Sequence, residues 1–142
     1  QEKMDYMILG KSRNCVFVPS EHPFAKRRSI SVEELSKENL IIMGNNSMNT
    51  GYQYYMNLCR KNGFEPQVAV QGDSISCIEY YLRCNKGVFL SMQAVFDYEV
   101  EGIVGVPVEE MEDHLIYLVW NRNRESRGLD NLLEFAGNKL FQ

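Results

Sequence analysis

One stretch near the N-terminus limits most strongly what this chain can fold into. Residues 15–18 are apolar, rich in β-branched side chains and stopped by Pro19, so they predict a buried strand rather than a helix. Ser31 and Glu34 form a Ser-x-x-Glu capping box, which predicts a short helix that begins at Val32. The apolar run at residues 40–43 predicts a second strand. Strand, helix and strand in this order open an α/β unit.

The rest of the chain continues to alternate between strands and helices. Residues 4–9 alternate weakly in polarity and predict a strand, which lies so close to residues 15–18 that we expect the two to pair antiparallel. Apolar side chains spaced three and four residues apart predict amphipathic helices further on. The other expected strands are residues 67–71, 88–90, 102–108 and 115–120, and the other expected helices begin near residues 52, 75, 92 and 124–126.

Composition restricts the classes of function. A chain of 142 residues, 44% of them hydrophobic, can bury one core, so its length predicts a single domain. The net charge of -4 argues against nucleic-acid binding by this chain itself. Its four cysteines lack a Cys-x-x-Cys spacing and a nearby histidine, which argues against a zinc or redox site and favours a reducing cytoplasm. A polar N-terminus without any long apolar run predicts neither a signal peptide nor a membrane span.

The motif His22-Pro23-Phe24-Ala25, directly after the first buried strand, resembles the His-Pro-Leu-Ala motif of LysR-type effector-binding domains. Further motifs of these transcriptional regulators follow in the same order over nearly the whole chain. They are Gly63-Phe64-Glu65-Pro66, residues 68–74, Asn85-Lys86-Gly87-Val88, Val106-Pro107 and Ile116-Tyr117-Leu118-Val119-Trp120. Two residues depart from the family pattern. Asn85 replaces a glycine, which asparagine can do at positive φ, and Met92 stands where the family often has proline.

The resemblance implies a fold and a division of the chain. The implied fold class is α/β, a three-layer αβα Rossmann-like lobe of the type 2 periplasmic-binding-protein fold. The chain would then be a partial effector-binding domain, with residues 1–14 as a hinge or lead-in strand and residues 15–121 as the second lobe. Residues 122–142 would form a helix that returns to a first lobe absent from this sequence. We expect the apolar stripe of that helix to pack on this lobe or on a second copy.

The resemblance also implies a function. The domain would sense a small, anionic metabolite bound between two lobes, and a shift between two arrangements would change how a homo-oligomer presents its DNA-binding domains. DNA would be contacted only through an N-terminal helix-turn-helix domain outside this sequence, and no membrane partner is expected. Two other interpretations remain open, an extracytoplasmic solute-binding protein and an enzyme of the same fold. The unpaired cysteines and the missing signal peptide weigh against the first.

The polar loop at residues 44–50 is the first candidate for the effector site. It precedes a predicted helix, and a helix N-terminus offers unpaired amides and the positive end of a dipole, which suit a small anion. Any of the serine, threonine or asparagine side chains here can alternatively cap the helix. The candidate ligand residues are Gly44, Asn45, Asn46, Ser47, Asn49 and Thr50.

Ser74 and Gly87 are second candidates, since they flank predicted strands at positions where open α/β sheets bind ligands. Helix capping and turn formation are the alternative roles of these two residues. His22 precedes a proline and is expected to be a turn residue rather than a base. The sequence has no nucleophile motif, phosphate loop or cluster of His, Cys and Asp, so it predicts no catalysis, no cofactor and no metal site.

Overall fold

The computed structural model describes residues 3–44, 50–96, 100–123 and 126–139. The chain divides into two compact units. Unit 1 comprises Gln1–Ser12 and Asp113–Gln142, and unit 2 comprises Arg13–Glu112. The chain therefore enters unit 2 at Arg13 and leaves it after Glu112.

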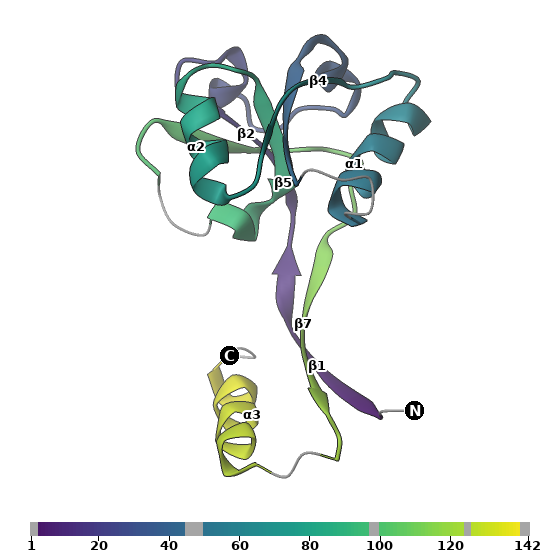
Figure 1. Ribbon diagram of the computed structural model, residues 1–142, viewed down its shortest axis with the longest axis vertical. Coiled ribbons are helices and arrows are strands. Elements are labelled where there is room, and N and C mark those ends of the chain that lie inside the picture. Colours follow the sequence, from purple (N-terminus) through teal and green to yellow (C-terminus); the bar gives the residue numbers. More distant parts are fainter. Residues whose placement is uncertain (1–2, 45–49, 97–99, 124–125, 140–142) are drawn as a thin grey trace. The chain divides into compact units, whose positions relative to one another are not determined.

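Unit 2 is built on a mixed five-stranded sheet (Figure 1). Its strands are β2 (Asn14–Pro19), β3 (Asn39–Met43), β4 (Gln67–Gly72), β5 (Val88–Met92) and β6 (Ile103–Pro107). They lie side by side in the order β4-β3-β5-β2-β6. β3 is parallel to β4 and β5, whereas β2 is antiparallel to β5 and β6.

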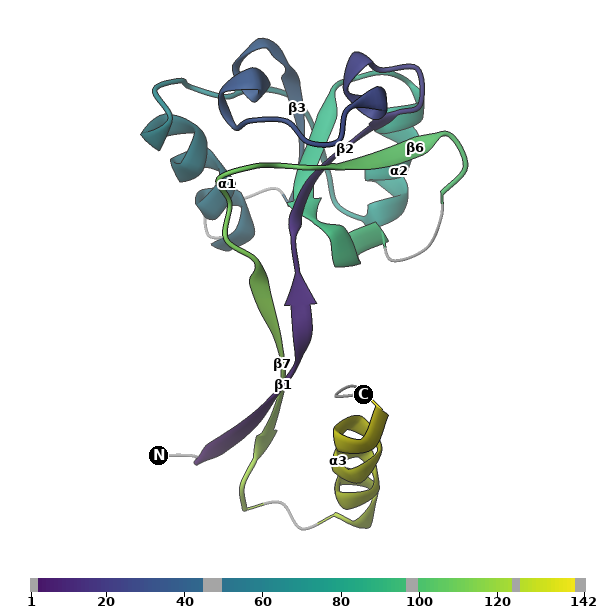
Figure 2. The same cartoon turned by 180° about the vertical axis from the view of Figure 1, so that it is seen from behind.

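Helices cover both faces of this sheet. The described helices of unit 2 are α1 (Thr50–Lys61), α2 (Ile75–Arg83) and three short 3-10 helices, η1 (Pro23–Lys26), η2 (Glu33–Lys37) and η3 (Gln93–Phe96). Figures 1 and 2 show α1 and α2 on opposite sides of the sheet. In the described part of the chain, no helix is long and apolar enough to cross a membrane.

The two faces of the sheet form two separate apolar cores, because successive side chains of a strand point to opposite faces. Val16 and Val18 of β2 pack into the core that holds Met56 of α1. Cys15 and Phe17, the alternate residues of β2, pack into the core under α2. Burying one such valine or phenylalanine contributes about 1.5–3 kcal/mol. This helix-sheet-helix layering is the three-layer αβα arrangement that the family resemblance implied.

The predicted pairing of the first two strands is wrong. β1 (Met4–Ser12) pairs antiparallel with β7 (His114–Asn121) and not with β2. Only Arg13 separates the end of β1 from the start of β2. A hairpin needs a loop of at least about two residues, so the chain cannot reverse here and must find its partners elsewhere.

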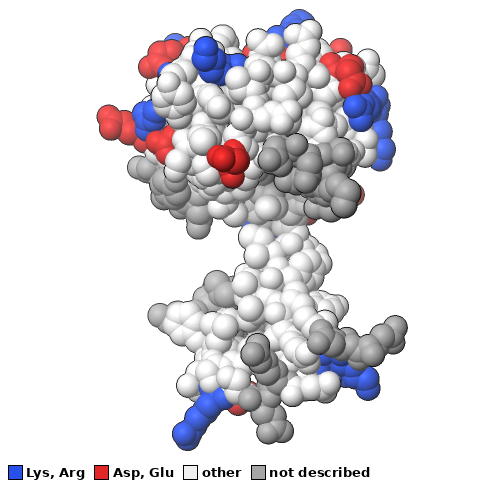
Figure 3. Space-filling model, viewed as in Figure 1, with Lys and Arg blue, Asp and Glu red and all other residues white. Residues whose placement is uncertain are grey.

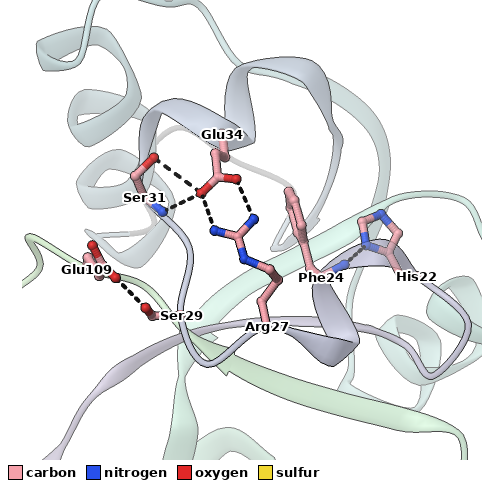
Figure 4. Close-up of polar contacts among 7 residues, drawn as sticks. All are labelled: His22, Phe24, Arg27, Ser29, Ser31, Glu34 and Glu109. Carbon is pink, nitrogen blue, oxygen red and sulfur yellow. Dashed lines mark hydrogen bonds and ion pairs between the residues drawn. The ribbon is translucent and has the colours of Figure 1, made fainter.

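Polar contacts fix the connection from β2 to β3 (Figure 4). The Ser31 amide donates to Glu34 Oε2 at 2.9 Å, which is one half of the predicted capping box. The Ser31 hydroxyl lies 3.5 Å from the same oxygen, and Arg27 Nη1 donates to Glu34 Oε1 at 2.9 Å. The helix that follows is the 3-10 helix η2, which begins one residue later than predicted, at Glu33.

Unit 1 contains the two-stranded ribbon of β1 and β7 and the helix α3 (Arg127–Lys139). An ion pair between Asp5, near the start of β1, and Arg122, directly after β7, links the two strands at one end of the ribbon. In the view of Figure 3 the ribbon carries few charged side chains, whereas unit 2 carries charges of both signs. Apolar side chains are exposed along the ribbon instead, namely Met4, Tyr6, Ile8, Leu115, Tyr117 and Val119.

Helix α3 is partly buried within unit 1. Ala136 is only 3% exposed, whereas Leu132 and Phe135 are 47% and 58% exposed. Leu129 lines an apolar groove of about 540 Å³ together with Val119 of β7. Of the apolar stripe of α3, Ala136 is therefore buried and Leu129 faces this groove, whereas Leu132 is exposed. The predicted lobe boundary at residue 121 differs from the end of unit 2, because β7 pairs with β1 along its whole length.

The ionisation of Glu34 makes the stability of unit 2 depend on pH. Hydrogen bonds from the Ser31 amide and the Arg27 guanidinium hold the pKa of the Glu34 carboxyl below its ordinary value of 4.5. The ionised carboxylate therefore stabilises the folded state above about pH 4.5, and this contribution is lost as the pH falls below it. We expect Glu34→Gln to lower the urea midpoint near neutral pH and to have a smaller effect at about pH 2.5.

Glu33→Gln is the matched control, because Glu33 is exposed and its carboxylate makes no hydrogen bond or ion pair with a described residue. Its effect on the urea midpoint should be small at both pH values. An equal loss at both pH values for Glu34→Gln would contradict the assigned role of the ionised carboxylate.

Candidate functional site

The carboxyl ends of β3 and β4 meet at one edge of the sheet, because the two strands are parallel. Met43 stands opposite Gly72, and the Gly44 amide donates to the Gly72 carbonyl at 2.9 Å. Gly44 has a φ of 91°, in the left-handed region that favours glycine. The chain therefore turns off the sheet directly after β3 and continues toward the N-terminus of α1.

Two more strands bring polar groups to the same edge. β5 is parallel to β3, so its carboxyl end lies here, and β2 is antiparallel to β5, so its amino end lies here too. Asn14 at the start of β2 is 1% exposed, and Ser91 near the end of β5 is 8% exposed. Such burial requires hydrogen-bond partners for both side chains.

A chain of hydrogen bonds joins these buried groups to α1. The Tyr55 hydroxyl donates to Asn14 Oδ1 at 3.0 Å, and Asn14 Nδ2 donates to the carbonyl of Glu112 at 2.9 Å. Burial raises the pKa of Tyr55 to about 12, and a hydrogen bond from Ser91 acts in the opposite direction. The Tyr55 phenol is therefore protonated at neutral pH and serves as a donor.

The candidate loop is described only at its two ends. Gly44 marks its start at the carboxyl end of β3, and Thr50 is the first residue of α1. The remaining candidate ligand residues, Asn45, Asn46, Ser47 and Asn49, lie outside the described residues.

Ser74 lies just beyond the carboxyl end of β4, at the same edge as Gly44, and caps α2. Its Oγ accepts a hydrogen bond from the Cys77 amide at 3.3 Å. Helix α2 lies close to β4 at this point: a Cβ on Gly72 would be only 2.8 Å from Ile78 Cδ1. The capping role that the sequence left open as an alternative for Ser74 is therefore observed.

Gly87 is not brought together with Gly44 and Ser74. It precedes β5, and the amino ends of the parallel strands lie at the opposite edge of the sheet. A Cβ on Gly87 would lie 2.3 Å from the Asn39 carbonyl oxygen, so close approach of two backbones explains the glycine. Gly87 lines a separate polar cavity of about 260 Å³ with His22, Lys37, Glu38, Asn39, Asn85, Lys86 and Val88. Asn85 has a φ of 52°, as predicted for the end of α2.

His22 is the turn residue that the sequence predicted. Its Nδ1 accepts a hydrogen bond from the Phe24 amide at 3.2 Å and thereby caps η1 (Figure 4). Its Nε2 lies 3.4 Å from Glu38 Oε2. Because Nδ1 accepts, the proton of the neutral ring lies on Nε2, where it points to the carboxylate. Both ring nitrogens are therefore used to hold the turn.

The four cysteines are free thiols. Burial raises the pKa of Cys15, and it raises the pKa of Cys59 to about 11, so both thiols stay protonated at neutral pH. No group of three or more His, Cys, Asp and Glu side chains within the described ranges could hold a metal ion. The carboxyl edge of the sheet instead offers amides, hydroxyls and a carboxamide, which are groups that bind a ligand by hydrogen bonds.

The sequence pattern did not single out Asn14 or Ser91, and it favoured the apolar core over pocket lining for Tyr55. Tyr55 does pack against the core under α1, but its hydroxyl also reaches Asn14. A buried tyrosine hydroxyl usually finds a hydrogen-bond partner, and this rule could have raised the question of a polar neighbour. No local pattern could have named that neighbour, because Tyr55 and Asn14 are 41 positions apart.

Residues 1–140 match the family model of the LysR substrate binding domain. The chain therefore belongs to this family. The HTH-type transcriptional regulator TtuA of Agrobacterium vitis is 27% identical over 137 residues, which cover 93% of this chain and 45% of that regulator. The chain thus spans less than half of the length of this curated relative.

Solved structures share the fold at low sequence identity. The CcmR regulatory domain of Synechocystis PCC6803, in complex with 2-PG, has a TM-score of 0.82 at 14% identity, over 100% of this chain and 69% of that chain. The BenM effector binding domain with its effector benzoate has a TM-score of 0.77 at 16% identity, over 95% of this chain and 62% of that chain. These matches confirm the predicted α/β fold of the type 2 periplasmic-binding-protein class.

The cap on α2 predicts the effect of removing the Ser74 hydroxyl. We expect Ser74→Ala to lower the free energy of unfolding by about 1 kcal/mol, because the Cys77 amide loses its acceptor. Ser74→Asp keeps a capping oxygen and should retain most of the stability. Urea denaturation of both variants provides the measurement.

Ser36→Ala is the matched control for this substitution. The Ser36 hydroxyl makes no hydrogen bond with any described residue, so its removal should change stability by less than about 0.5 kcal/mol. A loss in Ser74→Asp as large as that in Ser74→Ala would contradict the capping role.

Proposed function

We propose that this chain is the ligand-sensing part of a LysR-type transcriptional regulator. The family match and two effector complexes of the same fold support the proposal. The main observation behind it is the position of Gly44. This residue turns the chain away from β3 toward the N-terminus of α1, next to the carboxyl end of β4. Open α/β sheets bind ligands outside the carboxyl ends of their strands.

The ligand that fits this edge best is a small anion. Helix α1 has no acidic residue in its first turn and ends with Arg60 and Lys61, so no carboxylate of its own offsets the positive end of its dipole. Benzoate, the effector named for BenM, is a carboxylate. The ligand residues in this proposal are Gly44, Asn45, Asn46, Ser47, Asn49 and Thr50, with Ser74 on the rim. Gly87, at the opposite edge, is assigned to its turn instead.

The sensing mechanism is a shift between two arrangements of an effector-binding domain. Unit 2 supplies one wall of the ligand cleft in this proposal, and a first lobe outside this sequence supplies the other. A ligand shifts such an equilibrium only by its different affinities for the two arrangements, so contacts from both walls favour the closed one. DNA binding belongs to a further N-terminal domain, which agrees with the net charge of -4 here. This regulator works in the cytoplasm and has no catalytic role.

The proposed regulator is a homo-oligomer, and the free edge of β4 is a surface suited to a second copy. β4 is an edge strand of the sheet, and four of its side chains are exposed and uncharged. An uncharged, exposed edge strand is a template for pairing with another strand. The exposed residues are Gln67, Val68, Ala69 and Gln71.

A thermal-shift screen of the chain tests the proposed ligand site. The probes are benzoate, other small carboxylates and phosphate esters. A ligand at about one hundred times its dissociation constant adds about 2.7 kcal/mol of stability, which raises the melting temperature of a domain of this size by several degrees. We expect a stabilising ligand, and we expect Asn46→Ala and Ser47→Ala to abolish its effect.

Asn57→Ala is the matched control, because Asn57 is exposed in the middle of α1 and far from its first turn. It should keep the full ligand response. The same screen is repeated on a longer protein that includes the first lobe. It detects a ligand that binds only when both walls of the cleft are present. Stabilisation that survives both loop substitutions, or no stabilising ligand for either version, would contradict the proposed site.

A further inference from the structure

Buried polar side chains are rare in the described part of the chain, and two of them lie near each other at the carboxyl edge of the sheet. Among the described residues only Ser12, Asn14 and Ser91 are buried polar side chains, and two of them belong to the hydrogen-bond chain around Tyr55. Burying a polar group is unfavourable unless its partners are well placed. An apolar residue at position 14 would avoid this requirement, so the asparagine needs a reason beyond packing.

The hydrogen bonds of Asn14 connect α1 to both places where the chain passes between units. We call the two bonds Tyr55 Oη to Asn14 Oδ1, and Asn14 Nδ2 to the Glu112 carbonyl, the Asn14 link. Asn14 follows Arg13, the first residue of unit 2, and Glu112 is its last residue. The Asn14 carbonyl also accepts from the Val108 amide at 3.1 Å, which ties the end of β6 to the same residue.

We propose that the Asn14 link couples the position of α1 to the two chain segments at the boundary of unit 2. The bonds are directional and water is excluded from Asn14, so a displaced Tyr55 cannot keep the bond to Asn14 while the segments stay in place. Apolar contacts alone tolerate such sliding far better, because they are not directional. The biological input to this link, a ligand at the loop before α1, rests on the proposed function.

Loosening α1 without any ligand tests the coupling directly. Asn57 is exposed within α1. At such a position alanine stabilises the helix and glycine destabilises it. We expect the Val108 amide to exchange with solvent about fivefold faster in Asn57→Gly than in Asn57→Ala, which is the ratio that their helix propensities imply. In a Tyr55→Phe background, this difference between the two Asn57 variants should disappear.

Two controls separate coupling from a general loss of stability. The Cys84 amide, bonded to the Tyr80 carbonyl at the end of α2, reports opening far from the link, and its exchange should be equal in the two Asn57 variants. Tyr54→Phe changes the neighbouring tyrosine on α1 and should leave the difference at Val108 intact. Ser91→Ala, which spares both bonds of the link, should also leave it intact.

Asn14→Ala breaks the same link from its other side and serves as the second variant if Tyr55→Phe does not fold. A difference at Val108 that survives in either background would overturn the proposal. The proposal would also be overturned if Tyr54→Phe removed the difference in Val108 exchange as completely as Tyr55→Phe does. Because no ligand takes part, a negative result here leaves the ligand screen unaffected, and a failed screen leaves this result unaffected.

Discussion

Burial of the sheet of unit 2 on both of its faces is the constraint on which the rest of its structure depends. Helices cover both sides of the sheet, so consecutive residues of a central strand must all be apolar. β2 shows this requirement most clearly, since Val16 is fully buried on one side and Phe17 is 3% exposed on the other. Polar groups are thereby confined to the ends of the strands, where side chains and backbone can reach partners or a ligand.

This confinement explains why polar groups are found together at the carboxyl edge of the sheet. Gly44 turns the chain away from the sheet there, and Ser74 starts α2 at the same edge. Asn14 is an instructive exception, because it is buried although it is polar. Its hydrogen bonds to Tyr55 and Glu112 satisfy it and at the same time join a helix to the two ends of the unit. One side chain thus links the proposed ligand edge to the boundary between the units.

Local patterns predicted the fold well and the polar contacts poorly. The apolar runs at residues 15–18 and 40–43, the Ser31/Glu34 pair and the positive φ of Asn85 depend on neighbours in the sequence, and the structure contains them. Which strands pair with each other is not determined by residues that are close in the sequence. The partner of β1 comes from the other end of the chain, and the pairing with β2 failed because a single residue cannot form a hairpin. The Asn14 link was missed for the same reason, since all its contacts are long-range.

An amide chemical-shift titration of this chain, with the small anion that stabilises it in the thermal screen, locates the ligand site directly. We expect the largest shifts at Gly44, at Ser74 and in the first turn of α1, at the carboxyl edge of the sheet. Largest shifts at Gly87 and His22, around the polar cavity at the opposite edge, would contradict this expectation.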